Sequence, residues 1–138
     1  MTSQLNVDTI VDKAGSGGSN VKMANTSTYV GEGGGSTQNT VQGLIKSWVL
    51  ASNAASPTDS FNVSGGTDNG TGHYTYAFST NMGNTNYSVA AGTAGGSTFF
   101  GFNLSGSSAT GNHTNKIATD GGSLTDDINI SHVAGDLA

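Results

Sequence analysis

Apolar residues come in short stretches separated by glycine and small polar residues, a pattern typical of β-strands. The clearest stretch covers residues 44–50. Counted with the two-residue period of a strand, Leu44, Trp48 and Leu50 share one face, and Ile45 and Val49 share the other. Because both faces carry apolar residues, we expect a central strand here.

Further strands are predicted along the rest of the chain, and an Asn69-Gly70 pair marks a hairpin. Residues 73–78 place Tyr74, Tyr76 and Phe78 on one face, which predicts a core strand. The other predicted strands are 60–63, 87–91, 99–104, 116–118 and 128–133. No segment favours a helix of ten residues. The spacing predicts an all-β fold, namely an antiparallel β-sandwich (jelly-roll-like) head over residues 41–138.

The amino-terminal part has a different pattern of apolar and small polar residues. Residues 1–20 contain one apolar stretch with Leu5, Val7, Ile10 and Val11. A single strand buries nothing alone, so we interpret residues 1–20 as an extended, strand-like anchor whose four apolar residues contact another chain. Residues 21–40 include a glycine-rich run at 31–36 and are predicted to be a flexible linker.

The composition indicates that the protein is an assembly of several chains and not a single independent domain. Gly, Ser, Thr and Asn make 72 of the 138 residues, whereas Leu, Ile, Val and Phe make only 25 and cysteine is absent. Disordered chains combine such a shortage of apolar residues with high net charge, but only 9% of these residues are charged. We therefore predict a β-rich homotrimer that completes its core with aromatic or Val/Ile contacts between chains.

Charge and the distribution of apolar residues argue against two classes of partner. The chain has a net charge of −5, with four lysines and no arginine, so we expect no binding to nucleic acid. No apolar run approaches 18 residues and the amino terminus lacks the order of a signal peptide, which predicts no membrane insertion and no export.

Candidate chemistry is sparse. His73 and His132 fall in strand patterns and His113 in a Gly/Asn loop, without the spacing of metal ligands. The acidic residues at 120 and 126–127 lack the order of a calcium loop and are interpreted as solubilising charges at strand edges. We expect no catalytic residues, no metal site and no cofactor. Most of the aromatic side chains are assigned to the core, and Phe99 is predicted to point away from the face that Phe100 and Phe102 share.

Four segments of the predicted head resemble a β-domain of bacteriophage tail-fibre and other virion-fibre proteins, particularly those of marine and cyanobacterial phages. They are residues 43–49 (GLIKSWV), 59–64 (DSFNVS), 67–75 (TDNGTGHYT) and 84–89 (NTNYSV). Residues 5–15 (LNVDTIVDKAG) resemble a segment that often opens such proteins. With the residues between these segments included, the resemblance covers about half of the chain.

The resemblance implies a structural protein of the virion, exposed on the particle surface and bound to other virion proteins. One expected function is that of a tail fibre or tail-tip fibre whose head attaches to a host cell-surface glycan or protein. The alternative is a capsid decoration or head-fibre protein anchored by its amino-terminal segment. The loops at 81–86, 94–97 and 105–115 are candidates for contact with a receptor, although the sequence does not identify receptor-binding residues.

Overall fold

The computed structural model describes residues 28–30, 37–39, 43–94, 99–103 and 109–135. These residues fall into two units, with the division between residues 41 and 42. All regular structure in the described ranges is β, as predicted, and no helix there is long and apolar enough to span a membrane.

The first unit contains a short antiparallel hairpin. Strand β1 (Thr28–Val30) pairs with β2 (Thr37–Asn39), so two paired strands lie inside the range predicted as a linker. The anchor residues Leu5, Val7, Ile10 and Val11 and the glycine run at 31–36 lie outside the described residues.

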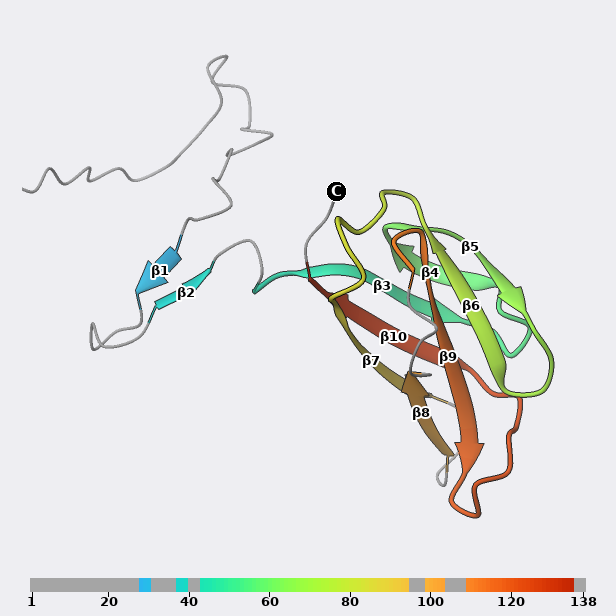
Figure 1. Cartoon of the computed structure of the whole chain (residues 1–138). Helices are drawn as coiled ribbons and strands as arrows, with labels where there is room; N and C mark the ends of the chain where they lie inside the picture. Colours follow the sequence, from blue (N-terminus) through green and yellow to red (C-terminus); the bar gives the residue numbers. More distant parts are fainter. Residues whose placement is uncertain (1–27, 31–36, 40–42, 95–98, 104–108, 136–138) are drawn as a thin grey trace, which may run out of the picture. The chain divides into compact units, whose positions relative to one another are not determined.

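The described residues of the second unit form two four-stranded antiparallel sheets (Figure 1). One sheet has the order β4 (Pro57–Phe61), β3 (Ile45–Ala51), β10 (Asn129–Ala134) and β7 (Ser88–Thr93). The other has the order β5 (Val63–Asp68), β6 (His73–Phe78), β9 (Asn112–Thr119) and β8 (Phe99–Asn103). Strand β3 is central in its sheet, as its two apolar faces predict.

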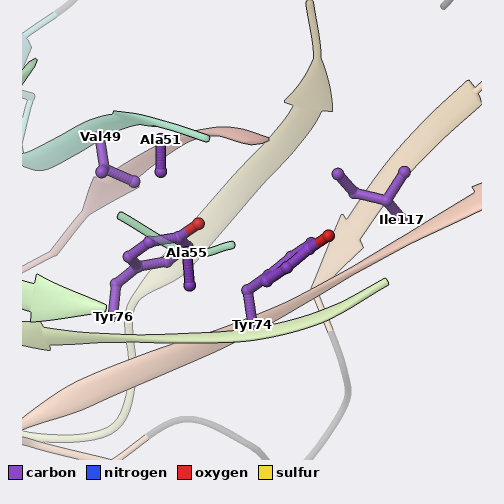
Figure 2. Packing of buried hydrophobic residues seen from close by; sticks show 6 residues of the cluster. All are labelled: Val49, Ala51, Ala55, Tyr74, Tyr76 and Ile117. Atoms are coloured by element: carbon purple, nitrogen blue, oxygen red, sulfur yellow. The ribbon is translucent and has the colours of Figure 1, made fainter. Parts of the chain in front are cut away.

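The inner faces of the two sheets share a core cluster. Val49 and Ala51 of β3 pack with Tyr74 and Tyr76 of β6, and the cluster is completed by Ile117 and Ala55. Figure 2 shows both tyrosine side chains projecting from β6 into this cluster. The predicted core face of β6 is thereby confirmed, because Tyr74 and Tyr76 are fully buried and Phe78 nearly so.

A second apolar cluster lies near the end of β6. Phe78 packs there with Met82 and Val133, flanked by the partly buried Tyr87 and Val89. The ring of Phe78 meets that of Tyr87 edge-on, with 5.9 Å between their centroids. The Tyr87 hydroxyl donates to the carbonyl oxygens of Ala109 and Asn112, so this residue ties the turn before β9 to the cluster.

Two turns decide how the chain connects its strands. The Asn69-Gly70 hairpin is confirmed: the His73 N–H donates to Gly70 O over 2.9 Å and the Asn69 N–H to His73 O over 2.8 Å. The prediction of one strand over residues 60–63 is wrong. The chain instead turns at Asn62, which has φ +56°, and passes from β4 in one sheet to β5 in the other.

Candidate interaction surface

The outer face of the β4-β3-β10-β7 sheet carries a cluster of apolar and aromatic side chains. Ser47, Val49 and Ala51 point inward from β3 and are buried, so the alternate residues Trp48 and Leu50 point outward. With their outward-facing neighbours they define what we call the aromatic face: Phe61, Trp48, His132, Leu50, Ile130 and Asp59.

Strand register arranges the aromatic face in two rows. In the first row, Trp48 pairs with Phe61 on one side and with His132 on the other. Directly paired residues of antiparallel strands have Cβ atoms about 5 Å apart, so the three rings are immediate neighbours. In the second row, Leu50 pairs with Asp59 and with Ile130. A short aromatic strip beside two aliphatic side chains is the result.

Strand β7, which pairs with β10, carries small residues beside these rows. On β7, Ala90 pairs with His132 and Gly92 pairs with Ile130. A Cβ atom added at Gly92 would meet nothing within 4 Å, so the space above it is open. The His132 end of the first row therefore lies beside two small residues of β7, Ala90 and Gly92, which we call the shelf.

Among the described aromatic residues that were assigned to the core, Tyr74, Tyr76 and Phe78 are buried there, whereas Trp48 lies on the aromatic face. Phe61 is 52% exposed and Trp48 is only partly buried. Period-two counting placed Trp48 and Leu50 on one face correctly, but it could not say which face would meet the other sheet. The side chains of Phe99, Phe100 and Phe102 lie outside the described side chains, although Phe100 pairs with Ala118 and Phe102 with Lys116.

The corner at Asn62 holds the Phe61 end of this face. The side-chain amide of Asn62 donates to Lys46 O at 3.0 Å and to Thr80 O at 3.1 Å, and its oxygen accepts from the Thr80 N–H at 2.6 Å. One amide thus joins β3, the turn between the sheets and the segment after β6. This role fits the left-handed backbone at Asn62, which asparagine tolerates better than most residues.

A second polar feature lies inside the protein, between β9 and β10. His113 Nε2 lies 2.9 Å from Ser131 Oγ, and Asn115 Nδ2 donates to Asn129 Oδ1 at 3.2 Å. All four side chains, which we call the polar ladder, have no solvent exposure. The ladder therefore connects the two sheets through hydrogen bonds instead of apolar contacts.

The placement of His113 corrects the prediction that it lies in a loop. It belongs to β9, which starts at Asn112, and its ring lies between Tyr76 and Phe78, with centroid separations of 5.6 and 5.4 Å. Burial lowers the pKa of His113 to about 4, so the imidazole is neutral at pH 7. The flanking Gly, Asn and Thr residues gave no strand signal.

Four buried polar atoms have no hydrogen-bond partner among the described residues. They are Tyr76 Oη, His113 Nδ1, Asn115 Oδ1 and Asn129 Nδ2. Burial also raises the pKa of the Tyr76 hydroxyl. Unpaired buried polar groups reduce the free energy of unfolding, so the polar ladder is a costly element of this core.

Two acidic residues that were interpreted as edge charges have structural partners. Asp126 Oδ1 accepts from the Gly72 N–H at 2.7 Å and from the Tyr74 hydroxyl at 3.1 Å. Burial, together with the neighbouring Asp126, raises the pKa of Tyr74 to about 12. Asp127 accepts from the Thr93 hydroxyl at 2.6 Å. Both carboxylates therefore fasten the segment before β10 to neighbouring strands.

The remaining predicted residues do not converge on one site. His73 starts β6 and His132 lies on the outer face of β10, whereas His113 lies in the core. In the part of the chain that the structure describes, no three His, Asp or Glu side chains gather as metal ligands would. Of the candidate receptor loops, 81–86 is described, 95–97 and 105–108 are not, and 112–115 belong to β9.

Comparisons with protein-family models, curated proteins and solved structures gave no match to this chain.

Proposed function

We propose that this chain is a structural protein of a bacteriophage virion. Its β-sandwich head (residues 41–138) would be exposed on the particle, and residues 1–20 would anchor it to other virion proteins. In this proposal the protein is a homotrimeric tail fibre or tail-tip fibre whose head attaches to the host surface. The two described sheets together contain eight strands, which is the number found in a jelly roll. Their pairing differs from a jelly roll, because β3 and β4 are neighbours in one sheet and β5 and β6 are neighbours in the other.

One observation supports a binding head most directly: the aromatic face. Gly, Ser, Thr and Asn make about half of the residues of this chain, so large apolar side chains are few. A half-exposed Phe61 next to Trp48 therefore leaves apolar surface exposed in a chain that has little of it. Clustered exposed apolar residues mark surfaces that meet a partner. The two-sheet unit also supplies the rigid scaffold that an exposed head needs.

The alternative function is capsid decoration. A small head next to one short anchor segment would suit a protein that projects from capsomers. Immunogold labelling of virions with antibodies against the chain separates the two functions, because gold on the tail supports the fibre and gold on the capsid supports decoration. Virions without any label would contradict both.

A further inference from the structure

We propose that the aromatic face binds a carbohydrate, with a sugar ring stacked on Trp48 between Phe61 and His132. This proposal rests on the proposed function only for the source of the sugar, a glycan of the host surface. It differs from the expectation that loops contact the receptor, because it assigns binding to the flat outer side of one sheet.

The size of the face favours a small ligand over a second copy of the chain. Strands lie about 4.8 Å apart and successive outward residues about 7 Å apart, so two rows on three strands cover at most a few hundred Å². A stable protein interface buries roughly 800 Å² on each partner. The apolar part of the face thus suits one or two sugar rings, and it is too small to hold a subunit by itself.

The chemistry of the face also matches a sugar. The face of an aromatic ring carries partial negative charge, which attracts the weakly positive C–H groups on the apolar side of a pyranose. The hydroxyl groups at the edge of the sugar need hydrogen-bond partners, and Asp59 and His132 border the apolar residues. Asp59 Oδ1 accepts from the Ser60 N–H at 2.9 Å, which holds this carboxylate at the rim.

The shelf on β7 leaves room for the ligand. Ala90 and Gly92 present little or no side chain next to His132 and Ile130. A ligand that extends from Trp48 past His132 would therefore lie over small residues of β7. Binding by one head is weak, and several linked heads would strengthen it through their effective concentration.

The test uses the complete chain on an array of bacterial surface glycans, and each positive is then measured by fluorescence. Trp48 is the only tryptophan, so its emission reports directly on this face. We expect binding to at least one glycan with a change in emission, and Phe61→Ala should weaken that binding about tenfold. The matched control is Leu124→Ala, which removes an exposed apolar side chain outside the aromatic face and should leave affinity unchanged.

Several outcomes would overturn this proposal. A silent array would do so, as would binding that Phe61→Ala and Asp59→Asn leave intact. A change of sedimentation in Phe61→Ala would show instead that a protein surface covers the face. If antibodies label the virion but no glycan on the array is bound, the carbohydrate proposal fails and the proposed virion function stands. If the chain binds a glycan but is absent from virions, the proposed virion function fails and the carbohydrate proposal stands.

Discussion

His113 and Ser131 form a hydrogen bond across the buried space between the two sheets, with 2.9 Å between Nε2 and Oγ. Neither side chain has any exposure to solvent, and no described group pairs with His113 Nδ1. A charged imidazole at this position would face Tyr76, Phe78 and Ser131, none of which carries a compensating negative charge at neutral pH.

The first prediction is that His113 makes the fold sensitive to acid. Its pKa is about 4 in the folded chain and about 6.5 when unfolded, so between these values only the unfolded state takes up the proton. Stability from this residue is intact above pH 6.5 and is lost as the pH falls to 4, by about 3 kcal/mol. Denaturant unfolding at pH 7.5 and at pH 4 measures the loss.

Variants separate this effect from acid titration elsewhere in the chain. The pair of substitutions His113→Phe with Ser131→Ala keeps the ring stacking and removes both polar partners, so it should flatten this part of the pH profile. If the pair does not fold, His113→Gln serves the same purpose. His132→Gln removes an exposed imidazole and should retain the full profile. A flat profile in the wild type would contradict the prediction.

The second prediction concerns three glycines that differ in their surroundings. A Cβ at Gly72 would lie 2.5 Å from Ile117 O, and the backbone there has φ +61°. Gly122 has φ +80° but open space, whereas Gly65 has open space and no positive φ. Gly72→Ala should therefore lower the free energy of unfolding by about 3 kcal/mol or more, and Gly122→Ala should lower it by about 1 kcal/mol. Gly65→Ala should leave the free energy of unfolding unchanged or raise it slightly.

Thermal and denaturant unfolding of the three alanine variants test this order. The comparison is internal, because all three substitutions add the same methyl group. If Gly65→Ala destabilised the fold as much as Gly72→Ala, the close approach of Gly72 to Ile117 and Thr125 would not be the cause.

The third prediction concerns the corner at Asn62. Asn62→Gly keeps the left-handed backbone and loses the side-chain hydrogen bonds to Lys46 and Thr80, which should cost about 2 kcal/mol. Asn62→Asp keeps an acceptor for the Thr80 N–H but places a carboxylate against two carbonyl oxygens, so it should be at least as harmful. Asn84→Ala is the control, since Asn84 Oδ1 accepts a local bond from the Asn86 N–H. Equal stability of all three variants would show that the corner does not depend on this amide.

Sequence patterns predicted the strands that have strong local signals. The alternation around Trp48, the three aromatic residues of β6 and the Asn69-Gly70 turn each fixed an element correctly. The patterns did not predict that β9 begins at Asn112, because its inward residues His113 and Asn115 are polar and look like loop residues. Their burial depends on β10, which pairs with distant strands, so it is a property of the whole sheet arrangement.

The aromatic face could not be predicted from the sequence either, because it depends on how distant strands pair. Period two groups Trp48 with Leu50, but only the register of β3 with β4 and β10 places Phe61, His132 and Asp59 beside them. The corner at Asn62 was missed for a related reason. It interrupts an apolar sequence without a glycine or proline, and its hydrogen bonds reach residues 16 and 18 positions away.

The fourth prediction is that the chain sediments as a homotrimer at micromolar concentration, with a mass about three times 13.7 kDa. Polar side chains occupy many of the fully buried positions, including His113, Asn115, Asn129, Ser47 and Ser131. The apolar area that stabilises one chain is correspondingly small, and contacts between chains would supplement it. Phe61→Ala should leave the trimer intact if the aromatic face is free for a ligand. A stable, folded monomer would contradict the prediction.

The last prediction concerns the anchor segment. Deleting residues 1–15 removes Leu5, Val7, Ile10 and Val11, which are expected to contact another chain. The described core clusters are formed by residues between 49 and 133, and we expect the shortened protein to keep its melting temperature. Virions assembled with it should lack the head, as measured by immunoblotting of purified particles against the full chain. A matched variant with Leu5→Ser and Val7→Ser tests the apolar contact itself. Normal incorporation of both variants would place the attachment point elsewhere, and a head that unfolds on deletion would show that the segment belongs to the fold.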